Sequence, residues 1–148
     1  MGDRVMELRA TFEEEWLVAE ARSSYPSMPL THRDLKVYRR AFELAGEVSR
    51  LERLFPKEEL YCLVPQIRRA ARSVHANIAE AWRKRRYEGA FIAKPSDAEA
   101  EAAETQSWLE TALDEGYIDA PTFDRLFQEY EHLLASIVGM IHYSENGP

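Results

Sequence analysis

The sequence has little of several features that mark well-known protein classes. Its 148 residues contain one cysteine, Cys62, so neither a disulfide within the chain nor a paired-cysteine metal site can form. The longest apolar-rich run, Leu133 to Ile141, is far shorter than the roughly 20 residues of a membrane-spanning helix. The N-terminal residues are acidic and lack the apolar stretch of a secretory signal. These absences predict a cytoplasmic protein that does not enter a membrane.

The motifs of common catalytic and nucleotide-binding sites are also missing. None of the patterns HExxH, GxSxG, GxGxxG or GxxxxGK occurs. A di-metal carboxylate site in a helical bundle needs a Glu-x-x-His pair on each of two helices, and Glu129 with His132 is the single instance. We expect this pair to be exposed, and Cys62 to be packed and inert. The sequence therefore predicts no enzyme activity, no catalytic residues, no cofactor and no metal site.

What is present is helical periodicity along almost the whole chain. Strong helix formers dominate, β-branched residues are sparse, and no segment alternates strictly between apolar and polar residues. A first helix is predicted from about Asp3 to Arg22, followed by a linker with two prolines, SSYPSMPL. We therefore divide the chain into residues 1–30, a helix with its linker, and residues 31–148, the main domain.

Two predicted helices follow the linker. The second predicted helix begins near Thr31, with Asp34 three residues later as in a capping box, and Pro56 ends it. Its apolar stripe is Leu35, Tyr38, Phe42, Ala45, Val48, Leu51 and Phe55. The third begins at once, with Glu58 and Glu59 in its first turn, where the helix dipole favours acidic residues. Its stripe has heptad spacing: Leu60, Val64, Ile67, Ala71, Val74, Ile78 and Ala81.

Two further helices complete the predicted bundle. The fourth follows Gly89 and ends at Gly116, and Pro95 predicts either a kink or a restart at Ser96. The fifth begins after Asp119, its N-cap, with the stripe Phe123, Phe127, Tyr130, Leu134, Ile137 and Ile141. Short loops force neighbouring helices to be antiparallel. The predicted fold is all-α: an antiparallel up-down-up-down four-helix bundle with an additional N-terminal helix.

Charge is distributed unevenly between the third and fourth predicted helices. Residues 57–86 contain eight Lys or Arg and three Asp or Glu, whereas residues 88–115 contain one and eight. One interpretation is attraction between neighbouring helices, and the other is a basic face that contacts phosphate groups. Aromatic residues beside this face are few, mainly Trp82 and Tyr87, which gives little support for base stacking. The candidate nucleic-acid-binding residues are Arg68, Arg69, Arg72, Arg83, Lys84, Arg85 and Arg86.

Asn77 is an unusual polar residue beside the apolar stripe of the third predicted helix, between Val74 and Ile78. Asparagine has a poor propensity for the middle of a helix. A hydrogen bond from its side chain to a neighbouring helix would fix the register or the assembly state. We therefore interpret Asn77 as a structural residue that indicates a specified interface.

Three segments carry a resemblance to a known family: LKVYRRAFELAGEV, LFPKEELYCLVPQIRRAARSVHANIAEAW and AEAAETQSWLETALDEGYI. They closely resemble small four-helix-bundle proteins encoded in intervening sequences of bacterial 23S rRNA genes, and the similarity covers about Leu35 to Ile141. The resemblance implies a bundle that assembles into a homopentamer and has no established enzyme activity. A related group serves as accessory proteins to the reverse transcriptase of diversity-generating retroelements. That group binds the enzyme and nucleic acid through a basic surface.

The motif positions of the family fall on residues 55–58, 66–70 and 77–80 of this sequence. The resemblance implies assembly roles for Gln66, Asn77 and Glu80, and makes the arginines candidates for anion contacts. Three functions remain open. The first is a homo-oligomer that binds RNA or DNA through a basic helix face. The second is a protein-interaction scaffold or an accessory protein, for example of a reverse transcriptase. The third, a ferritin-like metalloenzyme, has the least support.

Overall fold

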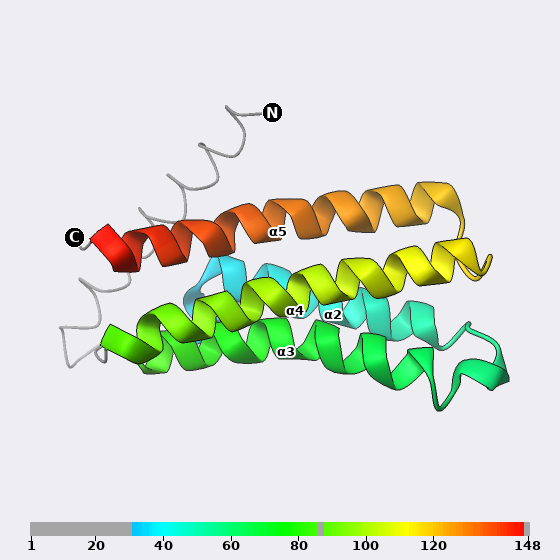
Figure 1. Cartoon of the computed structure of the whole chain (residues 1–148), viewed down its shortest axis with the longest axis horizontal. Coiled ribbons are helices and arrows are strands. Elements are labelled where there is room, and N and C mark those ends of the chain that lie inside the picture. Colours follow the sequence, from blue (N-terminus) through cyan, green and yellow to red (C-terminus); the bar gives the residue numbers. More distant parts are fainter. Residues whose placement is uncertain (1–30, 86–87, 147–148) are drawn as a thin grey trace.

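The computed structural model describes residues 31–85 and 88–146, and the side chains of residues 31–85 and 93–141. The predicted N-terminal helix, Arg86 and Tyr87 lie outside these residues. The described part contains no strand, and its long helices are α2 (Lys36–Glu52), α3 (Leu63–Arg83), α4 (Glu88–Asp114) and α5 (Ala120–Asn146). Each helix runs antiparallel to the one before it (Figure 1). The predicted all-α, up-down-up-down four-helix bundle is therefore confirmed.

The chain reaches α2 through a short 3-10 helix, η1 (His32–Asp34). The predicted capping box is present: the backbone N–H of Thr31 donates to the Asp34 carboxylate at 3.0 Å, and the Thr31 hydroxyl accepts from the Arg33 N–H at 3.3 Å. However, the box caps η1, because Leu35 is fully buried in an extended conformation and interrupts the helix. The α-helix then begins at Lys36, without a side-chain cap.

The connection from α2 to α3 differs from the prediction. After α2 ends at Glu52, a separate 3-10 helix, η2 (Lys57–Glu59), precedes α3. Pro65 is thus in the first turn of α3, where its missing N–H costs no helical hydrogen bond. Leu60 and Cys62 precede α3 and are exposed, so their predicted burial is wrong. The rest of the predicted stripe is confirmed as buried: Val64, Ile67, Ala71, Val74, Ile78 and Ala81.

The helix α4 continues through Pro95, so of the two predicted alternatives, a kink or a restart, the restart at Ser96 is wrong. Its end is the predicted glycine cap, because Gly116 has a positive φ of 79°. The Tyr117 N–H donates to the Ala112 carbonyl at 2.8 Å, and the Gly116 N–H donates to the Leu113 carbonyl at 3.0 Å. These two bonds make a Schellman motif. The N-cap of α5 is also confirmed, since Asp119 Oδ1 accepts from the Thr122 N–H at 2.9 Å.

The core lies along the bundle axis, and the contact between α3 and α4 is the most extensive. Small residues such as Ala71 on α3 and Ala102 on α4 are buried, and small side chains in general let packed helices approach closely. The helix α5 packs mainly on α4 and touches α2 much less. Its buried face therefore differs from the predicted stripe. Tyr130 and Ile137 are buried as predicted, but Leu126, Leu133 and Met140 replace Phe123, Phe127, Leu134 and Ile141, which are half-buried.

Candidate functional site

Some of the opposite charges on α3 and α4 pair with each other across the contact between the two helices. Arg69 Nη2 lies 2.7 Å from Glu104 Oε1, and Arg69 Nη1 lies 3.2 Å from Glu101 Oε1. Lys94 on α4 pairs with Glu80 on α3 at 2.7 Å. The hydrogen bonds to Glu104 and Glu101 raise the pKa of Arg69, and the Lys94 hydrogen bond lowers the pKa of Glu80. For Arg69 and Glu80, the first interpretation of the charge contrast therefore holds: their charges pair with opposite charges on the neighbouring helix α4.

Arg68 also has a partner within the chain. Its Nε donates to Glu52 of α2, whose carboxylate is buried, and the side chain of Arg68 is 40% exposed. The other carboxylate oxygen of Glu52 has no hydrogen-bond partner in the described part of the chain. Sequence reasoning missed Glu52, although the residue follows buried Val48 by one helical turn. Arg68 thus compensates the charge of a buried acid, and a ligand phosphate would have to compete with Glu52 for it.

The remaining predicted site residues have different environments. Arg85 stacks on Trp82, with its guanidinium carbon 3.9 Å from the ring centroid, and donates from Nη1 to the Trp82 carbonyl. The Asn77 amide donates to the Ser73 carbonyl of its own helix at 2.9 Å. Within the described chain the amide therefore bonds to its own helix, and the role of Asn77 in an interface stays a prediction. Gln66 is exposed, and Arg86 lies outside the described residues.

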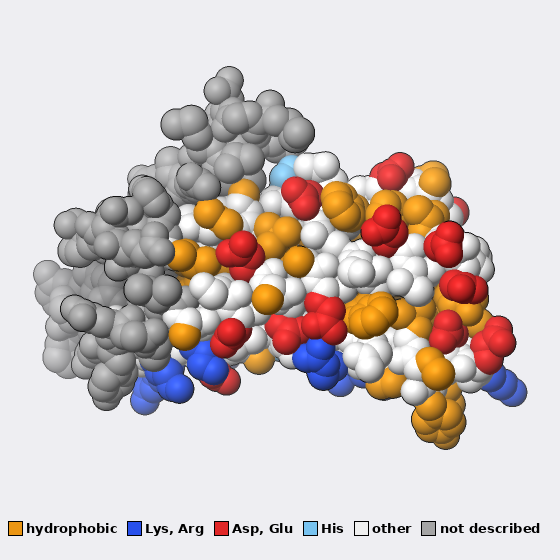
Figure 2. Space-filling view, in the orientation of Figure 1, with side chains coloured by type: hydrophobic (Ala, Val, Ile, Leu, Met, Phe, Trp, Pro, Cys, Tyr) orange, Lys and Arg blue, Asp and Glu red, His pale blue; other side chains and the backbone are white. Residues whose placement is uncertain are grey.

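Five exposed cations form what we call the basic surface, and no described acid pairs with any of them: Arg33, Arg39, Arg72, Arg83 and Lys84. They belong to η1, to the start of α2, and to the middle and end of α3. Because α2 and α3 are antiparallel, the start of one lies beside the end of the other (Figure 1). On the face in Figure 2, Lys and Arg lie along the edge formed by α3, whereas Asp and Glu are spread over α4 and α5. The sequence predicted three of the five.

Four rings from η1, α2 and α3 form what we call the aromatic cluster: His32, Tyr38, Phe42 and His75. Their centroids are 4.6 Å apart for His32 and Tyr38, 5.8 Å for Tyr38 and His75, and 5.1 Å for Phe42 and His75. Phe42 is 56% exposed, so its predicted place in the core stripe is wrong. Burial, and then the charges of Arg72 and His32, lower the pKa of His75. Few aromatic residues lie near α3 in the sequence, but η1 and α2 bring His32, Tyr38 and Phe42 beside His75 of α3.

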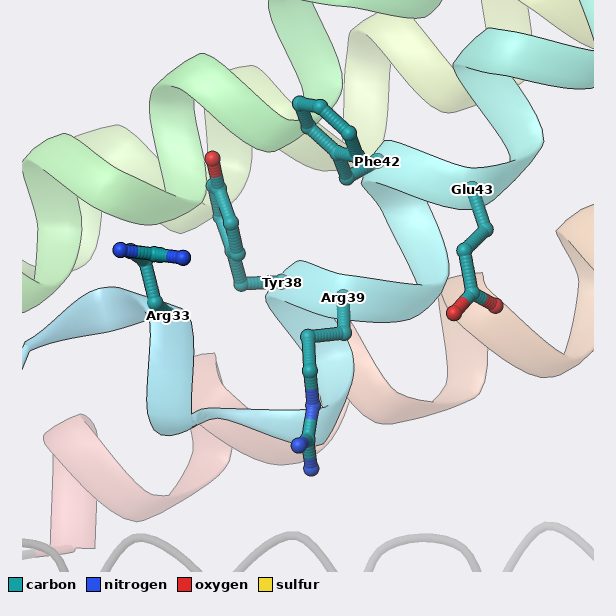
Figure 3. Close-up of a pocket in the computed structure, with 5 residues that line it drawn as sticks. All are labelled: Arg33, Tyr38, Arg39, Phe42 and Glu43. Carbon is teal, nitrogen blue, oxygen red and sulfur yellow. The ribbon is translucent and has the colours of Figure 1, made fainter.

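An open pocket lies on the outer side of α2, next to this cluster, lined by Arg33, Tyr38, Arg39, Phe42 and Glu43. Figure 3 shows that Tyr38 and Phe42 point to the same side of α2, toward α3, and that Arg33 approaches Tyr38 from η1. Arg39 and Glu43 form the neighbouring row of α2 and point away from the two rings. The pocket therefore joins aromatic surface to guanidinium groups, with one carboxylate on its far side.

No group of three or more His, Cys, Asp or Glu residues that could hold a metal ion occurs in the part of the chain that the structure describes. His132 lies 3.1 Å from Gln128, between His132 Nε2 and the Gln128 amide nitrogen. None of the described helices is both long and apolar enough to cross a membrane.

The sequence model of the family described as "23S rRNA-intervening sequence protein" matches residues 33–139. The chain belongs to this family. The matched range includes η1, α2, α3, α4 and most of α5, and therefore both the basic surface and the aromatic cluster. None of the curated proteins matches the chain.

A solved structure of similar fold comes from Bacteroides thetaiotaomicron and is described as a protein of unknown function from the S23 ribosomal protein family. It is 26% identical to this chain, with a TM-score of 0.65. The match covers 72% of this chain and 95% of the other. Family membership thus agrees with the helical bundle described above.

Proposed function

We propose that this member of the 23S rRNA-intervening sequence protein family is a non-enzymatic homo-oligomer that binds RNA or DNA through its basic surface. One observation carries the proposal: the five cations of the basic surface are exposed, and none of them forms a salt bridge with an acid among the described residues. The formal net charge of the whole chain is −7, so a polyanion is attracted only where cations gather locally.

The proposed interface contains different residues from the interface predicted from the sequence. Arg68 and Arg69, two of its original candidates, are neutralised by Glu52 and by Glu101 with Glu104. Arg72, Arg83 and Lys84 remain from the sequence prediction, and the pocket beside them brings in Arg33 and Arg39. A phosphate that contacts these free cations does not have to break an ion pair first.

Fluorescence anisotropy with labelled RNA and DNA at low salt tests the proposal. Because cations that contact phosphate release counterions, the logarithm of the binding constant should fall linearly with the logarithm of salt concentration. Arg72→Ala should weaken binding and make the slope shallower by about 0.7 to 0.9, the value for one lost phosphate contact. Arg53→Ala is the matched control, since Arg53 is an exposed arginine beyond the other end of α2.

The absence of association with either polymer at low salt would refute nucleic-acid binding. An equal effect of Arg72→Ala and Arg53→Ala would refute the location of the site, because a general loss of charge would then explain the result.

A protein-interaction scaffold is the second candidate, because apolar side chains are exposed at the end of the bundle where α2 connects to α3. Leu54 is 79% exposed, Leu60 51% and Tyr61 88%. Contiguous exposed apolar surface typically marks a site of protein association. Sedimentation of the wild type and of the Leu54→Ser/Tyr61→Ser variant tests this role. A discrete oligomer that the variant dissociates would support it, whereas a monomer at every concentration would end both this role and the homo-oligomer.

A further inference from the structure

We propose that the nucleic acid bound at the basic surface is single-stranded, with one unstacked base on the exposed ring of Phe42 and adjacent phosphates on Arg33 and Arg72. This inference rests on the proposed function and names the form of the ligand. Contacts between cations and phosphates alone would not distinguish a single strand from a duplex, whereas an aromatic contact to a base would.

The geometry of Phe42 carries the first step. Its centroid lies 5.1 Å from that of His75 at an interplanar angle of 62°, and 6.0 Å from that of Tyr38 at 31°. These neighbours fix the ring on one side, yet 56% of the residue remains exposed. A large apolar side chain held in place but left open is a ready stacking platform, because little conformational entropy is lost when a second flat group covers it.

The cations around the ring carry the second step. Arg33 reaches the cluster from η1 beside Tyr38 (Figure 3), and Arg72 is close enough to His75 to affect its titration. His32, Tyr38 and His75 are the titratable groups of the cluster, and burial with the nearby charges of Arg72 and His32 lowers the pKa of His75, which disfavours a positive charge on its ring. Glu43, the one carboxylate of the pocket, points away from the rings. Phosphates are therefore favoured on the sides of Arg33 and Arg72 and disfavoured on the side of Glu43.

Duplex and single-stranded nucleic acid differ in the part of each base that a protein can contact. Bases in a duplex are stacked on each other and offer only their edges, whereas a single strand presents base faces to aromatic side chains. Every base has such a face, so stacking tolerates any sequence. A ring on the outside of a helix, flanked by guanidinium groups, fits this mode better than it fits a groove-reading mode, which needs side chains that reach base edges.

The test compares three labelled oligonucleotides of equal length: a single strand, the same strand with abasic sites, and the duplex. The abasic strand keeps every phosphate and removes the stacking partner. We expect the wild type to bind the intact single strand about tenfold more tightly than the abasic strand, in line with the stacking of one base. Phe42→Ala should remove this difference and leave affinity for the abasic strand and the salt slope unchanged. Phe42→Trp should retain it.

Phe127→Ala is the matched control, because Phe127 is also a partly exposed phenylalanine packed against an aromatic neighbour, Phe123, but lies on α5. Circular dichroism of each variant checks its fold. Equal affinity of the wild type for intact and abasic strands overturns the inference, while loss on Arg72→Ala alone leaves the proposed function standing. Absence of binding to all three oligonucleotides ends both. Dissociation of the oligomer by Phe42→Ala, without a selective loss on the intact strand, also overturns the inference and assigns Phe42 to a contact between copies.

Discussion

Replacement of Arg68 by alanine removes the partner of a buried carboxylate, and the resulting loss of stability can be worked out from the structure. Glu52 is 2% exposed, and its carboxylate accepts a hydrogen bond from Arg68 Nε. The other carboxylate oxygen already has no partner in the described chain. Breaking a fully buried ion pair costs about 3–5 kcal/mol, because one charge is left without compensation. The Arg68 side chain is 40% exposed, so water reaches the pair and we expect a loss of about 2 kcal/mol.

Urea denaturation followed by circular dichroism, at one fixed protein concentration, measures this loss. Arg69→Ala is the comparison, because the Arg69 side chain is 52% exposed and exposed pairs are worth less than about 1 kcal/mol. Glu52→Gln/Arg68→Ala should lose less stability than the sum of the two single variants, since the amide does not leave a buried charge. A loss below about 0.5 kcal/mol for Arg68→Ala would refute the reasoning, because a buried unpaired carboxylate cannot cost so little.

Three further predictions concern the core, a helix cap and titration. Leu109→Ala should destabilise the bundle by about 2–5 kcal/mol in urea, since Leu109 is fully buried and leaves a cavity; an effect under 1 kcal/mol would contradict its place in the core. Gly116→Ala should cost about 1 kcal/mol from its φ of 79° alone, because no atom lies near an added Cβ, and an unchanged midpoint would argue against the Schellman motif. Burial and the hydrogen bond to Glu59 raise the pKa of Tyr117 to about 12, above the unfolded value, so its contribution to stability is present below pH 10 and is lost as pH rises toward 12. The difference in tyrosinate absorbance between the wild type and Tyr117→Phe measures this pKa, and ionisation near pH 10 would count against it.

Local features of the fold could be predicted from the sequence, because the interacting residues are close in the chain. The capping box at Thr31, the N-cap at Asp119 and the glycine cap at Gly116 each involve residues within a few positions of one another. The buried stripe of α3 was also predictable, because helical periodicity alone places Val64 through Ala81 on one face. The two errors near α3, at Leu60 and Cys62, arose because the helix begins later than its acidic first turn suggested.

The candidate site was less predictable, because it depends on which helix lies beside which and on how each is rotated. The sequence indicated a basic α3, and it did not show that Glu52 and Glu104 neutralise two of its arginines. It placed Phe42 in the core by spacing, whereas the position of α2 against α3 turns this ring outward beside His75.

The sequence by itself determined the helices, their antiparallel order and the local caps, because spacing and short loops act within one or two elements. Only the tertiary structure decided which cations are free and which rings are exposed, since ion pairs and burial depend on distances between residues far apart in the chain. The difference is clearest for Arg68 and Arg72, which are four residues apart on one helix: one is held by a buried acid of α2, and the other is open to a ligand.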